Sequence, residues 1–306
     1  MRQKAAAVSP DPWYEWLLHS RHADDPVEHK IVLSEVARYA DRVLAGANLL
    51  PGMTLADIGS GEGLIAFKAI DQIGPNFQVI LTDISASLLE HSRKLAINTG
   101  VLNQCTFLES NAEQLHGIKD ESVDVVTTRA TLAYVANKDS ALREFHRILK
   151  PGGRISLAEP IMMDEALATC ALKAAVDNED LDDADPFLGL MHRWKAAQFP
   201  DTANKMALCP MTNFTERDLV RLAQKCEFKE IHMELHIDVR PLEVSSWETF
   251  ICSAPHPLAP SLSTILADHF TIAERAKFES VLRPMIKEGN LSVEDKVAYL
   301  TAIKNK

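Results

Sequence analysis

The sequence predicts an α/β fold in which a doubly wound sheet carries helical cap insertions. Three observations lead to this prediction. Apolar strand signals alternate with helix signals through the middle of the chain, a glycine-rich turn joins the first of these strands to a helix, and the alternation stops after residue 160. A chain of 306 residues, 46% of them hydrophobic, is also long enough to bury a substantial core.

Five strands are expected in the alternating region, and turn signals separate them. The turn Pro51-Gly52 precedes the first strand, and Pro151-Gly152-Gly153 ends a helix expected at about 139–149. We interpret Ser87-Leu88-Leu89-Glu90 as a capping box that opens a helix ending near Gly100. The expected strands are 53–58, 78–83, 105–109, 123–127 and 154–159.

The remaining segments are interpreted as additions to one core. Residues 161–210 look irregular to helical, and the acidic run at 178–186 is expected to be a solvated loop or part of a mobile lid. A helix at 215–226 and a strand at 228–240 follow, and 296–303 suits a final strand, with a short helix as the alternative. We expect a single domain over 1–306, made of a core (about 30–160, 215–240 and 294–306), an N-terminal cap (1–29) and two inserts (161–210 and 242–293).

The overall charge favours a small-molecule or protein substrate over a nucleic acid. The formal net charge is −11, and no run of Lys and Arg forms a basic patch. No apolar run approaches the length of a membrane span and no secretory signal is seen, so we expect no membrane partner and a cytoplasmic location. The five cysteines are scattered without a Cys-x-x-Cys pair, which predicts free thiols rather than a disulfide framework or a metal site.

The strongest local signal is the run Asp57-Ile58-Gly59-Ser60-Gly61-Glu62-Gly63 between an expected strand and an expected helix. Glycines at alternate positions let the backbone turn sharply and approach a ligand. The dinucleotide spacing Gly-x-Gly-x-x-Gly fails because residue 64 is Leu. Asp57 would repel a phosphate and attract an ammonium group, so the turn favours a cofactor with an amino-acid moiety and no phosphate.

Polar residues follow the next three strands where each one ends. Asp83 lies 20 residues beyond Gly63, where an acid can bind both ribose hydroxyls of an adenosine. Asn111-Ala112-Glu113 would pass the adenine edge, and Thr128-Arg129 would lie at the carboxyl edge of the sheet, where such folds bind ligands. The alternative for each acid is that it only caps the next helix.

Residues 50–160 resemble the class I S-adenosylmethionine-dependent methyltransferases. TLADIGSGEG is similar to the first motif of that family, VILTD to its acidic second-strand motif, and LKPGGRISLAEP to the segment entering its fifth strand. The resemblance implies a seven-stranded Rossmann-like sheet with an antiparallel last strand, for which 296–303 is the candidate. It implies that Asp57, Gly59 and Gly61 contact the methionine part of S-adenosyl-L-methionine, Asp83 the ribose, and Asn111 and Ala112 the adenine. The predicted cofactor site also includes Ser60, Gly63, Ile84, Glu113, Thr128 and Arg129.

A finer resemblance concerns the methyl acceptor. WYEWLLHSRH and VVTTRATLAYVANKDSALREFHRILKPGG resemble bacterial methyltransferases of small metabolites, among them the methionine S-methyltransferases. A thioether acceptor carries a lone pair and no proton, so it needs orientation but no general base. The expected partner is therefore a small-molecule acceptor, and because helical additions of this size often supply dimer contacts, a homodimer is a possible assembly.

Seven residues are candidates for the acceptor site, each with a plainer alternative. Arg129 can pair with a carboxylate of the cofactor or the acceptor, and Glu159 can hold an ammonium group or be a solvated strand-end acid. His22 and His192 are possible bases or structural histidines. The aromatic candidates Trp13, Tyr134 and Trp194 can stabilise sulfonium cations or simply pack in the core.

Three other functions remain open from the sequence. An O- or N-methyltransferase would need a base, and His22 or His192 would then be essential. An arsenite methyltransferase would need cysteine thiolates, which the scatter of the cysteines disfavours. A cofactor-binding assembly protein without catalysis is disfavoured by the intact glycine turn and Asp83.

Overall fold

A computed structural model describes residues 11–178 and 185–306, so most of the acidic run at 178–186 lies outside the described residues. The described chain forms one seven-stranded sheet in the order β3-β2-β1-β4-β5-β7-β6, which confirms the predicted fold class. The strands β1 to β5 are parallel, and β7 is antiparallel to both of its neighbours. The strands are β1 (Thr54–Ile58), β2 (Gln78–Asp83), β3 (Cys105–Glu109), β4 (Val123–Arg129), β5 (Leu149–Pro160), β6 (Lys229–Pro241) and β7 (Ser292–Ile303).

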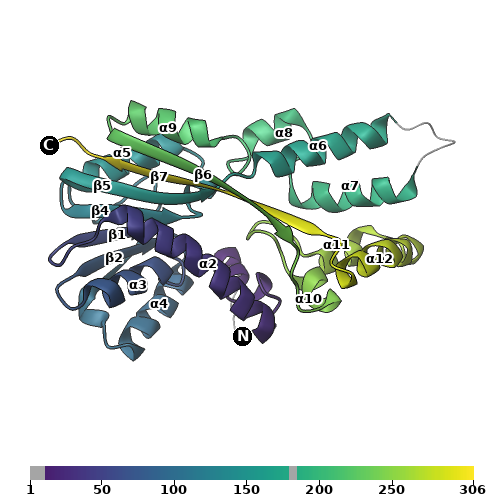
Figure 1. Cartoon of the computed structure of the whole chain (residues 1–306), viewed down its shortest axis with the longest axis horizontal. Helices are drawn as coiled ribbons and strands as arrows, with labels where there is room; N and C mark the ends of the chain where they lie inside the picture. The colour runs from purple at the N-terminus through teal and green to yellow at the C-terminus, as the bar shows by residue number, and fades with distance from the viewer. Residues whose placement is uncertain (1–10, 179–184) are drawn as a thin grey trace, which may run out of the picture.

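Helices cover both faces of the sheet and form a separate helical lobe beside it (Figure 1). One buried apolar cluster joins α5 and α9 to one face, and a second joins α2 and α3 to the other. The helices packed on the sheet are α2 (Pro26–Ala47), α3 (Leu64–Ile73), α4 (Ala86–Asn98), α5 (Lys138–Ile148) and α9 (Glu216–Lys225), with short 3-10 turns η2 (Leu102–Gln104) and η3 (Leu132–Tyr134).

The inserted segments build the lobe and lie over one edge of the sheet. A third apolar cluster, which includes Leu190, Trp247 and Phe278, joins α7 to the helices of the second insert. The long strands β6 and β7 run as a ribbon from the sheet to this lobe (Figure 1). The additions are α1 (Pro12–Glu15) and the π-helix η1 (Trp16–Ser20), then α6 (Met163–Asp177), α7 (Pro186–Gln198) and α8 (Ala203–Leu208), and finally α10 (Trp247–Cys252), α11 (Leu262–His269) and α12 (Ile272–Lys287).

Besides shifts of one or two residues at other element ends, the structure corrects the sequence prediction in three places. The capping box at Ser87 is wrong: Ser85 is the N-cap of α4, because its backbone is extended and its hydroxyl accepts a hydrogen bond from Leu88 N at 3.0 Å. Strand β5 begins at Leu149, so Pro151-Gly152-Gly153 is an irregularity within it rather than a break before it. The last strand begins at Ser292, and the helix alternative for 296–303 is wrong.

The helices of the described residues were also examined as membrane spans. Within ranges 11–178 and 185–306, no helix combines the length and apolar character that crossing a membrane requires.

Candidate active site

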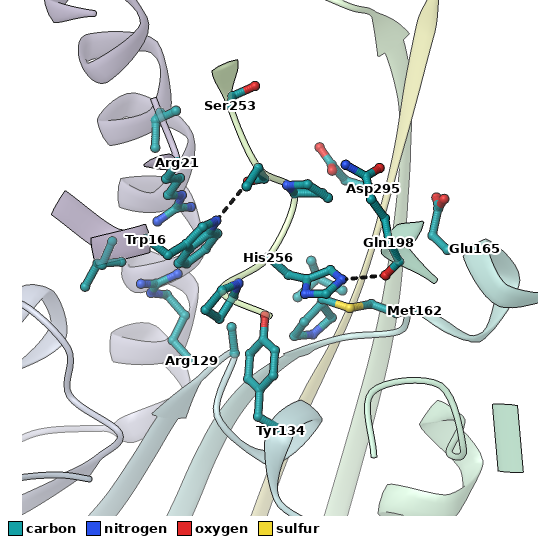
Figure 2. Close-up of a pocket in the computed structure, with 18 of the residues that line it drawn as sticks. Trp16, Arg21, Arg129, Tyr134, Met162, Glu165, Gln198, Ser253, His256 and Asp295 are labelled. Atoms are coloured by element: carbon teal, nitrogen blue, oxygen red, sulfur yellow. Dashed lines mark hydrogen bonds between the residues drawn. The ribbon is translucent and has the colours of Figure 1, made fainter. Parts of the chain in front are cut away.

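A cavity of about 1050 Å³ lies at the carboxyl edge of the parallel strands. Its wall combines the ends of β1, β2 and β4 with all three additions: Trp13 and Trp16 from the N-terminal cap, Met191 from the first insert, and His256 from the second. Figure 2 shows these segments converging on one space, with Arg129 and Tyr134 rising from the sheet side. The volume is enough for a cofactor and a small second ligand together.

The glycine turn at the mouth of β1 needs glycine for steric and conformational reasons. Gly59 and Gly61 both line the cavity and both have positive φ, +64° and +56°. A Cβ on Gly59 would lie 2.4 Å from the Thr131 hydroxyl, and one on Gly61 would lie 3.0 Å from a Leu17 methyl group. The turn therefore keeps its backbone open to the cavity, as a ligand-binding turn requires.

Asp83 is fixed to this turn by the backbone. Gly61 N donates to Asp83 Oδ2 and Ser85 N donates to Oδ1, both at 2.9 Å. The side chain lines the cavity although the residue is only 7% exposed, and burial raises its pKa above the ordinary value. Each carboxylate oxygen keeps a second lone pair, so the group can still accept hydrogen bonds from a ligand diol.

The cavity collects most of the predicted cofactor residues but not all of them. Asp57, Ser60, Gly63 and Thr128 are not among the lining residues. The Ser60 hydroxyl is buried without a hydrogen-bond partner in the described chain, which leaves a donor unused beside the turn. The predicted cofactor residues on the wall are Gly59, Gly61, Asp83, Ile84, Asn111, Ala112, Glu113 and Arg129.

Asp57 lies beneath the turn rather than on the wall. The residue is 2% exposed, and Thr127 Oγ1 donates to its Oδ1 at 2.9 Å. Burial raises the pKa of this carboxyl from 3.8 to about 7. Asp57 therefore shapes the charge behind the turn, and a direct contact with the cofactor ammonium group is not supported by this geometry.

The raised pKa of Asp57 predicts a pH-dependent stability. The folded state holds the proton up to about pH 7 while the unfolded chain releases it near pH 4, so the free energy of unfolding falls as pH rises through that window. Asp57→Asn removes this titration. We expect wild type to lose up to about 4 kcal/mol relative to the variant between pH 4 and pH 8. Urea unfolding of the two cofactor-free proteins at each pH measures this difference in the free energy of unfolding. If that free energy changed with pH equally in wild type and Asp57→Asn, the raised pKa of Asp57 would be contradicted.

Glu159 has a role other than the predicted one. The residue is fully buried, Thr128 Oγ1 donates to Oε1 at 2.5 Å, and the backbone N–H groups of Thr131 and Ala133 donate to Oε2 at 3.0 and 3.1 Å. This contradicts the expectation that Glu159 holds an acceptor ammonium group, and equally the alternative of a solvated acid. Glu159 instead fixes the loop that carries Arg129 and Tyr134.

Neither candidate base reaches the cavity. His22 is 6% exposed and its ring stacks on His29 with a centroid separation of 4.4 Å. His192 Nε2 lies 3.3 Å from Asp201 Oδ2. Both are absent from the described cavity wall, which agrees with the structural alternative for each histidine.

The aromatic candidates do line the cavity, together with residues that sequence reasoning left out of the site. The Trp13 and Tyr134 rings meet edge to face at 5.0 Å. Trp194 lines the cavity and also packs on Phe278 at 5.7 Å, which fits the packing interpretation, while contact with a sulfonium cation stays a prediction. The omitted lining residues include Trp16, Arg21, Met162, Glu165, Gln198 and His256.

Trp16 closes the site between distant parts of the chain. Its Nε1 donates to the carbonyl oxygen of Ala254 at 2.8 Å, which ties the N-terminal cap to the second insert (Figure 2). The Arg21 guanidinium lies over the Trp16 ring, 5.0 Å from its centroid. The clustering of Trp13, Trp16 and Arg21 in the sequence was a usable signal, but the contact with Ala254 was not visible there.

The chain was compared with known families, relatives and structures. A family model described as a methyltransferase domain matches residues 49–216, more than half of the chain. A ubiquinone/menaquinone biosynthesis C-methyltransferase of Shewanella frigidimarina is 32% identical over 144 residues, covering 47% of this chain and 57% of that one. Its counterpart in Brucella abortus is 38% identical over 109 residues, covering 36% and 40%. The chain thus spans about half the length of these curated relatives.

Solved structures share the fold at low identity. The YcgJ protein of Bacillus subtilis superposes with a TM-score of 0.54 at 16% identity, covering 88% of this chain and 99% of that one. A chain from the complex of the Haloferax volcanii Trm112 activator with a methyltransferase gives 0.52 at 15% identity, covering 98% and 100%. With the glycine turn, Asp83 and the sheet order, the family match shows that the chain belongs to the methyltransferase domain family and is a class I S-adenosylmethionine-dependent methyltransferase.

Proposed function

We propose that the enzyme methylates a small metabolite bound in the same cavity as the cofactor. One observation carries this: a single cavity of about 1050 Å³ joins the Gly59–Gly61 turn and Asp83 to aromatic and guanidinium side chains from the cap. When bound, S-adenosylmethionine supplies an electrophilic methyl group on a sulfonium sulfur. Trp13, Trp16 and Tyr134 present aromatic faces and edges that exclude water and tolerate a cation. Asp83 would hold the ribose.

As the acceptor we propose the thioether of methionine, giving S-methylmethionine. Its support is the absence of a free histidine base on the described cavity wall. His256 is the one histidine among the described lining residues, and both ring nitrogens are occupied: Nε2 pairs with the Gln198 carbonyl oxygen at 2.8 Å, and Leu258 N donates to Nδ1 at 3.2 Å. Because Glu159 is buried, we propose Glu165, which lines the cavity, as the residue that binds the acceptor ammonium group.

A thioether acceptor predicts that the two histidines from the sequence are dispensable. His22→Gln and His192→Gln should each lower kcat by only a small factor, because neither ring reaches the cavity and no proton is removed. A general base normally contributes about 10²–10⁴-fold. Steady-state kinetics with the acceptor measures this, and cofactor affinity serves as the folding control. A fall of that size in either variant would point to a protic oxygen or nitrogen acceptor.

One alternative acceptor chemistry has a specific observation in its favour. The curated relatives are named C-methyltransferases of quinone biosynthesis, and their similarity covers 47% and 36% of this chain. A carbon acceptor on a phenolic ring would need deprotonation and a wider apolar wall. An arsenite acceptor is not supported, since no cysteine lines the described part of the cavity.

Two measurements test the proposal. Calorimetry should show binding of S-adenosylhomocysteine, and labelled S-adenosylmethionine should transfer its methyl group to L-methionine in a panel that includes phenolic, amine and thiol acceptors. Transfer to a phenol alone would replace the sulfur acceptor with a carbon or oxygen one. Binding without transfer to any compound would favour the cofactor-binding assembly protein.

A further inference from the structure

Two guanidinium groups face the cavity without an ion-pair partner among the described residues. Arg21 follows the π-helix η1 and Arg129 ends β4, and Figure 2 shows both near the Trp16 ring. Across ranges 11–178 and 185–306, neither forms an ion pair or a side-chain hydrogen bond. Burial and the charge of Arg129 lower the pKa of Arg21 to about 10, so the Arg21 guanidinium stays charged at neutral pH and is repelled by Arg129.

Two half-buried cations that lack ion-pair partners in one cavity favour two anionic groups on the ligands. The methionine part of the cofactor brings one carboxylate, so one guanidinium is left over. Arg129 is closer in the fold to the cofactor turn, because the following Thr131 donates to the Ile58 carbonyl oxygen at 3.1 Å and packs against Gly59. Arg21 comes from the cap, and its stacking on Trp16 leaves the guanidinium edge free for a planar carboxylate.

Building on the proposed function, we infer that Arg21 binds a carboxylate of the methyl acceptor while Arg129 binds the carboxylate of the cofactor. The acceptor is therefore a small carboxylic acid, and Arg21 determines that specificity. A neutral analogue of the same shape would leave the buried guanidinium unpaired, which binding sites built around a charged hydrogen bond discriminate against strongly.

The test separates the two arginines by ligand. Binding of S-adenosylhomocysteine is measured by calorimetry for wild type, Arg21→Gln and Arg129→Gln. Wild type and both variants, each with S-adenosylhomocysteine present, are then titrated with L-methionine, L-methioninamide and inorganic phosphate. We expect Arg21→Gln to weaken binding of L-methionine at least about tenfold and binding of S-adenosylhomocysteine less than about threefold. Arg129→Gln should instead weaken binding of S-adenosylhomocysteine by the larger factor and binding of L-methionine by the smaller one. Arg21→Lys, which keeps the charge, should restore part of the L-methionine affinity.

The outcomes are distinct. Failure of wild type to bind S-adenosylhomocysteine would refute the proposed function itself. Binding of S-adenosylhomocysteine with no binding of L-methionine or phosphate would refute the anion site alone, as would equal affinity for L-methionine and its amide. Phosphate binding that depends on Arg21, without L-methionine binding, would also overturn the carboxylate assignment in favour of a phosphorylated acceptor.

A second inference concerns the outer edge of the sheet and is independent of the cavity. β6 is the terminal strand, and no described strand pairs with its free side. Its apolar side chains become more exposed along the strand: Leu235 is 39%, Ile237 51% and Val239 67% exposed. A long edge strand with exposed apolar residues is a template for another strand.

The sequence of β6 is complementary to itself in one antiparallel register. With Leu235 on a two-fold axis, every apolar side chain between 231 and 239 faces an apolar one and every carboxylate faces a histidine. Opposite partners lie on the same face of a sheet, so such pairs contact directly. The pairs are Ile231 with Val239, Met233 with Ile237, His232 with Asp238, Glu234 with His236, and Leu235 with itself.

We propose that a second copy of this chain pairs along β6 in that register and forms a two-fold symmetric dimer with a continuous sheet. The charge and apolar complementarity identify the occupant as the same strand, because an isologous interface must match itself under a two-fold rotation. The dimer axis would then pass through Leu235.

Light scattering after gel filtration tests the assembly on the full chain. Wild type should have twice the 33.9 kDa chain mass. Ile237→Lys should be monomeric, because the lysine of each copy would face the apolar Met233 of the other. Ile272→Lys is the matched control: Ile272 is 91% exposed on α12, outside the edge, and its variant should stay dimeric. A monomeric wild type, or a dimer that survives Ile237→Lys, would overturn the proposal.

The register has its own test. In a Cys252→Ser background, which removes the exposed native thiol, Leu235→Cys should form an intermolecular disulfide because residue 235 faces itself. Val239→Cys in the same background should not, because its partner is Ile231. Cross-linking of the second variant and not the first would refute this pairing.

Discussion

Gly61→Val is expected to abolish cofactor binding while the protein stays folded. The backbone at Gly61 has a φ of +56°, which a β-branched residue adopts only with strain of about 1–3 kcal/mol. Its side chain would also meet Leu17 and fill the space beside Asp83, where the ligand must approach the backbone. We expect no measurable heat for S-adenosylhomocysteine in calorimetry at concentrations that saturate wild type.

The control for Gly61→Val isolates backbone strain from blockage of the site. Gly100 also has a positive φ, +75°, and nothing lies within 4 Å of a Cβ built on it. Gly100→Val should therefore lower the melting temperature by a comparable amount and bind the cofactor normally. Unchanged affinity in Gly61→Val would refute the assignment of this turn to the cofactor.

Asp83→Ala is expected to give the second largest effect on cofactor affinity. The variant loses two charge-assisted hydrogen bonds to the ribose, each contributing about 1.5–3 kcal/mol at most. It also frees Gly61 N and Ser85 N, which Asp83 holds at 2.9 Å, so the turn loses an anchor. Together these predict a loss of about 10²–10⁴-fold in affinity for S-adenosylhomocysteine.

A ligand comparison shows whether that loss comes from the ribose. Wild type should bind the 2′-deoxy analogue of S-adenosylhomocysteine clearly more weakly than the parent compound. In Asp83→Ala the difference between the two ligands should vanish, because the hydroxyl has lost its partner. A preserved difference would assign the ribose to another residue and leave Asp83 as an anchor of the turn alone.

The cofactor half of the site was predictable because its signals are local. The turn from Asp57 to Gly63 and the acid Asp83 each end a strand, and parallel strands bring their carboxyl ends to one edge. The strands 78–83 and 105–109 were predicted at their observed bounds. The local sequence pattern could not show how deeply a side chain is buried. Asp57 and Glu159 were therefore expected to face the ligand, whereas the structure buries both.

The acceptor half was less predictable because long-range contacts create it. Arg21 reaches the cavity only because the N-terminal cap folds back over the sheet, and His256 because the second insert closes from the other side. The bond from Trp16 to Ala254 joins residues 238 positions apart. No spacing rule in the sequence encodes such a contact, whereas the resemblance over 50–160 covered only the sheet.

The position of β7 between β5 and β6 has a consequence for how the chain is made. β6 ends at Pro241 and its only described partner strand begins at Ser292, so residues 242–291 must be synthesised in between. At about 5–20 residues per second, the nascent chain leaves β5 and β6 without their shared partner strand for about 2–10 seconds. Any polypeptide that stops before Ser292 keeps both edges open, so ribosome stalling or proteolytic clipping in α10–α12 would yield aggregation-prone fragments that chaperones must shield.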